Sequence, residues 1–104
     1  MDTNKLIALL PEMAVFVVVL EEGSFSKAAE KLGVAPSSVS RSISKLENAL
    51  CQKLLERTTR NMRLTIAGEE VHGLCMDMLK SARLATDAAF SSQGEVAGEI
   101  RIAA

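Results

Sequence analysis

The sequence has little of what membrane, secreted and single-strand-binding proteins need. It has no Trp or Tyr and only three Phe, so it lacks the aromatic platforms on which single-stranded nucleic acids stack. Its longest apolar run, residues 13–20, is far shorter than the roughly 20 residues of a membrane span. The N-terminus has no basic stretch followed by an apolar core, so we expect no signal peptide, no membrane partner and a cytoplasmic protein.

Cysteine and histidine are too few for a structural metal site. Cys51 and Cys75 form no C-x-x-C pair, and His72 is the only histidine. The spacing from Gly68 to Gly73 fits a phosphate-binding loop, but a leucine follows where that loop needs lysine. Since the histidine also lacks plausible Asp and Ser partners for a triad, we expect no metal, no cofactor and no enzyme activity in this chain.

The net charge of −1 conceals an uneven distribution. Residues 1–25 and 66–104 each carry −3, whereas residues 26–65 hold eight Lys and Arg against three Glu and carry +5. A basic segment between two acidic ends is typical of a protein that binds a polyanion. On charge alone, a solvated charged face explains the distribution equally well.

Apolar spacing predicts helices at the start of the chain. Thr3 is a candidate N-cap of a short helical lead-in, and Pro11 suits the first position of a new helix. Residues 13–20 also fit a buried strand, but Pro11 at one end and Gly23 at the other favour a helix.

Two further helices joined by a tight turn are predicted next. Ser24 is placed to cap a helix over residues 25–32, and Gly33 marks its end. Three residues of that helix are expected to face inward: Ala28, Ala29 and Leu32. A helix from Pro36 follows, whose apolar stripe is Val39, Ile43, Leu46 and Leu50.

The second half of the chain changes pattern twice. Residues 54–65 predict two short strands around a polar tip, a small hairpin or wing. Thr65 followed by two glutamates then predicts the start of a long helix that runs to about residue 92. Residues 91–98 have the composition of a linker, and residues 99–103 alternate like the first strand of a domain that the chain does not complete.

Polar side chains gather on the side of the helix from Pro36 that lies opposite Val39. At 100° per residue they are Ser37, Arg41, Ser44, Lys45 and Asn48. Short serines let the backbone approach base edges, and Arg41 can reach two acceptors of guanine, a contact that is worth about 1–3 kcal/mol. The base-reading candidates are Pro36, Ser37, Ser38 and Arg41. The competing interpretation is a serine-rich, solvated helix face.

Further basic and hydroxyl side chains are candidates for contacts with phosphates or a narrow minor groove. Arginines recur every third residue through the hairpin, at Arg57, Arg60 and Arg63. Lys45 lies further along its helix and suits a phosphate. The full set is Ser26, Lys31, Ser40, Lys45, Arg57, Thr58, Thr59 and Arg60.

The long helix carries an apolar seam with alternating steps of four and three residues, which is typical of a coiled coil. Its members are the expected dimerisation residues Val71, Cys75, Met78, Ala82, Ala85 and Ala89. A helix that lies on its own domain shows similar spacing, but one this long projects beyond a module of about 55–60 residues. A protein-interaction module that uses the amphipathic helix 66–92 is the alternative function.

The motifs together resemble the N-terminal part of LysR-type transcriptional regulators. The resemblance covers roughly residues 8–68 closely, and many positions at fixed spacing make it specific. It rests on Gly23-Ser24-Phe25-Ser26-Lys27-Ala28-Ala29, Leu32, Val34, Val39-Ser40-Arg41, Ile43, Leu46-Glu47, Leu50, Leu54-Leu55-Glu56-Arg57-Thr58-Thr59-Arg60 and Leu64-Thr65-Ile66-Ala67-Gly68.

This resemblance implies a homodimer, often a dimer of dimers, that binds an interrupted inverted repeat in double-stranded DNA. It also implies RNA polymerase as a further partner and a C-terminal domain that binds a small-molecule effector. The chain departs from the family at Ala35-Pro36, where Ser-Gln is usual, at Cys51, where Gly is usual, and at Leu55, where Phe is usual. Base specificity therefore does not carry over at the start of that helix.

The sequence thus predicts a mostly α protein in three parts. Residues 8–65 form a winged helix-turn-helix domain, a three-helix core plus a short β-hairpin wing, with the helix-turn-helix at about 25–44 and the wing at about 54–65. Residues 66–92 form a coiled-coil-like linker and dimerisation helix. Residues 93–104 are expected to be a hinge and the start of an effector-binding domain.

Overall fold

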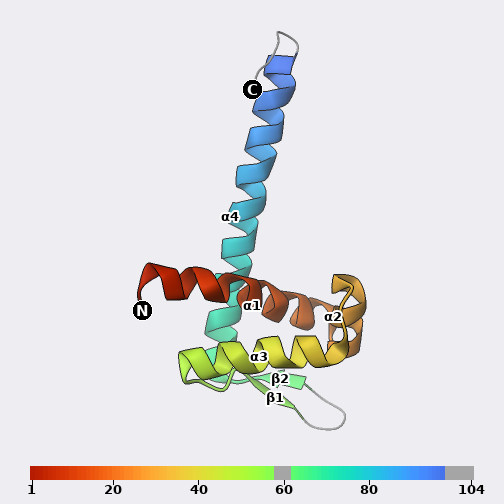
Figure 1. Ribbon diagram of the computed structural model, residues 1–104, viewed down its shortest axis with the longest axis vertical. Helices are drawn as coiled ribbons and strands as arrows, with labels where there is room; N and C mark the ends of the chain where they lie inside the picture. The colour runs from red at the N-terminus through yellow and green to blue at the C-terminus, as the bar shows by residue number, and fades with distance from the viewer. Residues whose placement is uncertain (58–61, 98–104) are drawn as a thin grey trace.

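The computed structural model describes residues 1–57 and 62–97. Four helices and a two-stranded antiparallel sheet follow one another in this part of the chain (Figure 1). They are α1 (Thr3–Glu22), α2 (Phe25–Leu32), α3 (Pro36–Leu50), β1 (Leu55–Arg57), β2 (Met62–Leu64) and α4 (Ile66–Ala97). The expected mostly α winged helix-turn-helix architecture with a long C-terminal helix is confirmed.

Helix α1 is longer than the sequence predicts, and two expectations about it are wrong. Asp2, not Thr3, is the N-cap, because its carboxylate accepts the backbone N–H of Lys5 at 2.8 Å. Pro11 lies inside the helix and does not begin a new one. Although an interior proline removes a hydrogen bond, Leu9 anchors the preceding turn in the core, where it is 4% exposed. Packing therefore overrides the local preference.

Helix α1 is also long and apolar enough, by length and composition, to cross a membrane. Its buried face nevertheless supplies the centre of the domain, since Phe16, Val17 and Val19 are at most 2% exposed. It packs against α2, α3 and α4. We therefore assign α1 to the core of the domain.

The turn between α2 and α3 forms as predicted. The Ser24 hydroxyl accepts the N–H of Lys27 at 3.0 Å and caps α2. Gly33 ends this helix with φ of 72°, a left-handed conformation that glycine adopts without a steric penalty. Ala28 and Ala29 are buried as expected, but Leu32 is 39% exposed, so its inward placement was wrong. Leu32 is the last residue of α2, where the chain turns away from the core.

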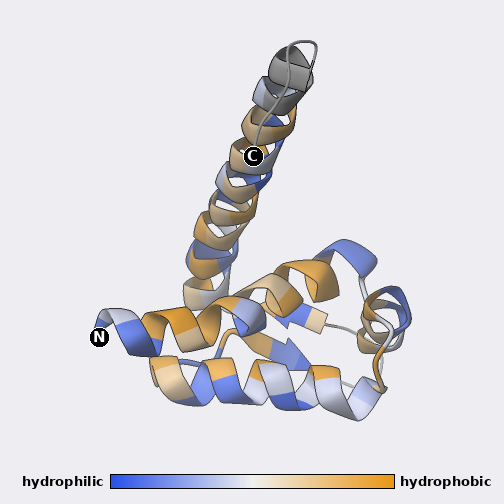
Figure 2. Cartoon of the chain, turned by 45° about the horizontal axis from the view of Figure 1, so that its top comes forward, coloured by the Kyte–Doolittle hydropathy of each residue, from blue (hydrophilic) through white to orange (hydrophobic). Residues whose placement is uncertain are grey.

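The apolar stripe of α3 faces α1 and α2, while its polar residues face outward (Figure 2). Val39, Ile43 and Leu46 are fully buried and contact the α1 side chains of the core. Leu50, the fourth predicted member, is half-buried against this cluster. Helix α3 is therefore fixed along one face and free along the other.

The wing is fastened to both neighbouring helices. Its strands pair antiparallel, with Leu55 opposite Leu64 and Arg57 opposite Met62. Leu54 and Leu55, at the start of the hairpin, are buried in the core and attach the hairpin to it. The predicted polar tip, which includes Thr58, Thr59 and Arg60, lies outside the described residues.

Helix α4 has 32 residues and extends to Ala97. The prediction that a linker begins at residue 91 is therefore wrong. Thr65 caps it as expected, because its hydroxyl accepts the N–H of Gly68 at 2.9 Å. The first half of α4 packs on α1, with the His72 ring edge-on to Phe16 at 5.9 Å between centroids. Every side chain from Lys80 to Ser92 is exposed, and the helix projects from the body (Figure 1).

Candidate nucleic-acid interface

The outer face of α3 presents the polar side chains that the sequence predicts there. Ser37, Arg41, Ser44, Lys45 and Asn48 are all exposed, as is Pro36, while Ser38 and Ser40 are half-buried. The N-cap residue Ala35 makes no side-chain hydrogen bond, so no side chain caps the start of this helix. The face is open, cationic and rich in hydroxyls.

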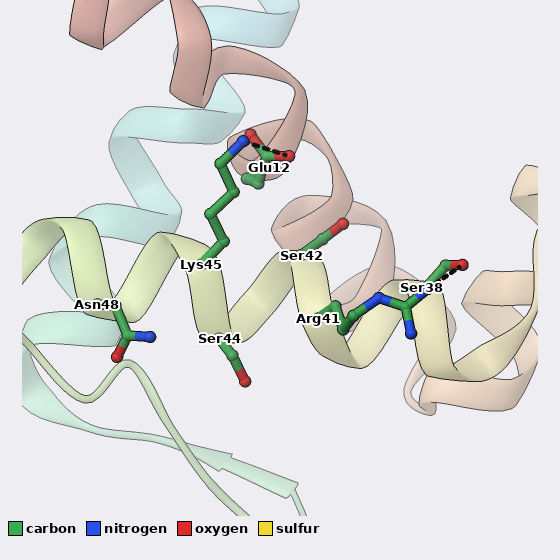
Figure 3. Close-up of a pocket in the computed structure, with 7 residues that line it drawn as sticks. All are labelled: Glu12, Ser38, Arg41, Ser42, Ser44, Lys45 and Asn48. Atoms are coloured by element: carbon green, nitrogen blue, oxygen red, sulfur yellow. Dashed lines mark hydrogen bonds and ion pairs between the residues drawn. The ribbon is translucent and has the colours of Figure 1, made fainter.

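An open pocket of about 700 Å³ runs along the side of α3 toward α1 (Figure 3). It brings together candidates for base reading and for phosphate binding. The residues that line it are Glu12, Ser38, Arg41, Ser42, Ser44, Lys45 and Asn48. Arg41 donates from Nη2 to the Ser38 hydroxyl at 3.3 Å, which places the guanidinium beside the N-terminal half of α3.

The candidate phosphate-binding cations Arg57 and Lys31 interact with different kinds of side chain. Arg57, at the end of β1, is exposed, and its guanidinium lies 4.6 Å from the centroid of the Phe25 ring at the start of α2. Such cation–π contacts orient an arginine without neutralising it. Lys31 instead pairs with Glu22 of α1 at 3.4 Å. Ser26 is exposed on the first turn of α2.

Four residues make contacts near this interface that the sequence did not predict, although Thr65 itself was expected at the start of α4. Glu47 is half-buried, and its Oε2 accepts the N–H groups of Leu54 and Leu55 at 2.8 and 3.1 Å. Thr65 donates from its hydroxyl to the Lys53 carbonyl at 2.6 Å. The other two are Gly68 and Glu12. Gly68 was a usable signal, because a glycine inside a helical pattern weakens the helix and so often has a packing reason.

Gly68 allows α4 to start against the wing. A Cβ built at this position overlaps the carbonyl oxygen of Leu54. The contact sets where the long helix leaves the domain, because the same carbonyl also accepts the N–H of Thr65 at 3.0 Å. Gly73, one to two turns further along, has nothing within 4 Å of an added Cβ.

The predicted dimerisation seam divides into two parts. Cys75 is buried and Val71 is half-buried against the core of the same chain, so these two seam positions contact their own domain. They face inward because α4 crosses α1 over its first turns. Met78 is half-buried, whereas Ala82, Ala85 and Ala89 are exposed. The free part of the seam therefore lies beyond the body.

The two cysteines have opposite environments. Burial raises the pKa of the Cys75 thiol, because desolvation disfavours the thiolate. Cys51 is exposed and ends α3 with φ of 55°, a left-handed conformation that is uncommon outside glycine. Among the described residues, no group of three or more His, Cys, Asp or Glu side chains gathers into a metal-binding cluster.

Comparison with known proteins agrees with this geometry. The family model described as bacterial regulatory helix-turn-helix protein, lysR family, matches residues 10–69. The chain belongs to the lysR family. The predicted resemblance is thereby confirmed, and α2 and α3 are the helix-turn-helix of a LysR-type regulator.

Individual relatives extend the match into α4. This LysR-type chain is 46% identical over 94 residues to the probable HTH-type transcriptional regulator LtrA of Klebsiella pneumoniae, a match that covers 90% of the chain but 30% of LtrA. The chain therefore spans less than a third of that relative's length.

Two solved structures have the same fold. The BenM DNA-binding domain in complex with catB site 1 DNA is similar at a TM-score of 0.73 and 33% identity, covering 83% of this chain and 94% of that one. The oxidised form of OxyR from Corynebacterium glutamicum is similar at a TM-score of 0.75 and 31% identity, covering 84% of this chain and 27% of that one.

Proposed function

We propose that this LysR-type domain binds double-stranded DNA sequence-specifically as part of a homodimeric transcription regulator, with α3 in the major groove. The observation that carries the proposal is the exposed outer face of α3, where Arg41 stands among serines while the opposite face is buried. A major groove about 12 Å wide admits one α-helix. The BenM DNA-binding domain, which shares this fold, was solved bound to DNA, and this supports the proposal.

We distinguish contacts with base edges from contacts with phosphates and the minor groove. Pro36, Ser37, Ser38 and Arg41 lie at the N-terminal half of α3 and meet base edges, with Arg41 bidentate to a guanine. Phosphate and minor-groove contacts come from the remaining candidates, which add affinity without sequence information. These are Ser26, Lys31, Ser40, Lys45, Arg57, Thr58, Thr59 and Arg60.

Dimerisation is assigned to the projecting half of α4. Isolated helices shorter than about 12–15 residues are marginal in water, and most of the stability of a helix in a protein comes from packing against a partner. The exposed positions Ala82, Ala85 and Ala89 form the seam, since small residues let two helices approach closely. Two copies related by a two-fold axis then present two α3 helices to an interrupted inverted repeat.

Other parts of the proposal concern the longer protein. We assign residues 8–65 to the DNA-binding domain and residues 66–92 to the linker helix. Residues 93–104 were expected to be a hinge, but α4 continues through Ala97, so we assign the hinge toward an effector-binding domain that takes a small molecule to the chain beyond this helix. We place the protein in the cytoplasm, because its proposed ligand is chromosomal DNA. RNA polymerase is a further proposed partner. We propose no enzyme activity for this chain.

Selection from a random duplex library tests the proposal. We expect enrichment of an interrupted inverted repeat and binding that weakens steeply with salt. Arg41→Ala is expected to relax preference at one base pair of each half-site, and Arg60→Ala to weaken all duplexes alike. Equal losses on every duplex from both variants contradict this division of roles. If the protein binds no duplex in a gel-shift assay, whether it is a monomer or a dimer, the proposed function is wrong and the protein-interaction module is the remaining alternative.

A further inference from the structure

A carboxylate of α1 reaches the outer side of α3. Glu12 Oε2 lies 3.8 Å from Lys45 Nζ, at the side of the open pocket that faces α1 (Figure 3). The side chain of Lys45 is 58% exposed, whereas that of Glu12 is 14% exposed. Lys45 therefore points along the domain surface toward α1, while Arg41 runs along α3 toward Ser38 (Figure 3).

Glu12 depends on this lysine for its charge compensation. Its second oxygen, Oε1, is buried and has no hydrogen-bond partner among the described residues. A carboxylate that has lost water and gained few hydrogen bonds is stabilised chiefly by a nearby cation. Lys45 is the cation that the structure places there.

Arg41 is held differently. It donates to a neutral serine hydroxyl and keeps its full positive charge on the outer face of α3. The other acid of α3, Glu47, is engaged with the backbone N–H groups of Leu54 and Leu55. Of the two cations on α3, one is therefore offset by a carboxylate and the other is not.

We propose that Glu12 withholds Lys45 from DNA phosphates and thereby weakens sequence-independent binding, so that base contacts by Arg41 carry a larger share of the affinity. The inference rests on the proposed function, and it removes Lys45 from the set of residues that contact phosphate in the wild-type chain. Sequence-independent binding is almost wholly electrostatic, and removal of one effective cation per protomer lowers it directly. Glu12 is thus a positioning residue that sets the balance between random and specific duplexes.

The first test is Glu12→Gln in the full 104-residue chain, since glutamine keeps the shape of glutamate and removes its charge. Binding to a random duplex is measured over a salt series. We expect the slope of log K against log salt to steepen by about 0.9 per protomer, and random-duplex affinity to rise about five- to tenfold at 0.1 M salt.

Glu21→Gln is the matched control, because Glu21 is an exposed residue of the same helix and the change in net charge is identical. Equal slopes and affinities for the two variants overturn the inference. Weaker random binding by Glu12→Gln also overturns it, because Glu12 then helps Lys45 to reach phosphate. In Glu12→Gln/Lys45→Gln, the slope should return to that of the wild type.

Heparin chromatography separates failure of this inference from failure of the proposed function. Heparin is a polyanion without bases, so retention reports cationic attraction even if no duplex binds. We expect Glu12→Gln to elute at higher salt than Glu21→Gln. Coincident elution overturns the inference. A shift in elution without any duplex binding overturns the proposed function and the effect on DNA, while it still shows that Glu12 offsets the charge of Lys45. Thermal unfolding verifies that each variant is folded.

Discussion

The two halves of α4 belong to the same helix but have opposite environments. Its first turns lie on α1, where Cys75 is buried and the His72 ring contacts Phe16 edge-on. From Lys80 to Ser92 every side chain is exposed, although the spacing of apolar residues hardly changes. One periodic seam thus serves first as a domain core and then as a free surface. Periodicity reports that a face is apolar, and only the fold decides what covers it.

The largest effect should come from the close contact that starts the buried half. Gly68→Ala places a methyl group on the Leu54 carbonyl oxygen, and backbone on both sides must move. We expect the free energy of unfolding to fall by about 3 kcal/mol. Denaturant unfolding measures this loss.

Gly73→Ala is the matched control on the same helix, because an added methyl there meets nothing. It should gain about 1 kcal/mol from helix propensity. If both variants are stabilised alike, the first turns of α4 are less closely packed on the wing than the structure indicates.

In the exposed half of α4, a charged substitution should weaken dimerisation without changing the stability of the folded monomer. Ala85→Asp places a carboxylate in the free seam of each protomer, so we expect the dimer Kd to rise about 100-fold, which corresponds to about 2.7 kcal/mol. Unfolding of the monomer should change by less than about 0.5 kcal/mol. Sedimentation equilibrium measures the Kd. Thr86→Asp, about 100° around the helix, is the control and should leave the dimer nearly intact.

The body also depends on a side chain that fastens the wing. Glu47→Ala removes the acceptor of two backbone N–H groups, which lie at the start of the hairpin. Leaving such donors unsatisfied should cost about 2 kcal/mol of unfolding free energy. Glu47→Gln retains an acceptor oxygen and should lose less. If Glu47→Ala and Glu47→Gln lose the same amount, charge and not hydrogen bonding fastens the wing.

The smallest effect is a gain. Cys51 holds a left-handed conformation at the end of α3, which costs a non-glycine residue roughly 1–2 kcal/mol. Cys51→Gly should therefore raise the free energy of unfolding by about 1 kcal/mol, whereas Cys51→Ala should leave it nearly unchanged. Calorimetry distinguishes the two. Equal stability of both variants would show that φ at this position is relaxed.

Local signals predicted the elements of the body well. Ser24 and Gly33 delimit α2, Pro36 begins α3, and Thr65 begins α4, because caps and turns are decided by chemistry within a few residues. The stripe of α3 predicted its buried face, and its angular opposite predicted the exposed set around Arg41. These features depend on helical geometry alone.

Features that depend on distant parts of the chain were not predictable from sequence. Pro11 remains inside α1 because Leu9 reaches the core, and Val71 and Cys75 face inward because α4 crosses α1. The pairing of Glu12 with Lys45 joins residues 33 positions apart in the sequence.

The sequence by itself therefore determined α2, α3, the turn between them, the start of α4, the hairpin and the cationic face of α3. Tertiary structure alone decided which half of the α4 seam is free, where α4 leaves the body, and which cation of α3 meets a carboxylate. The physical reason is range: caps, turns and periodicity act over one or two helical turns, whereas burial and ion pairing are settled by whichever elements the fold brings into contact.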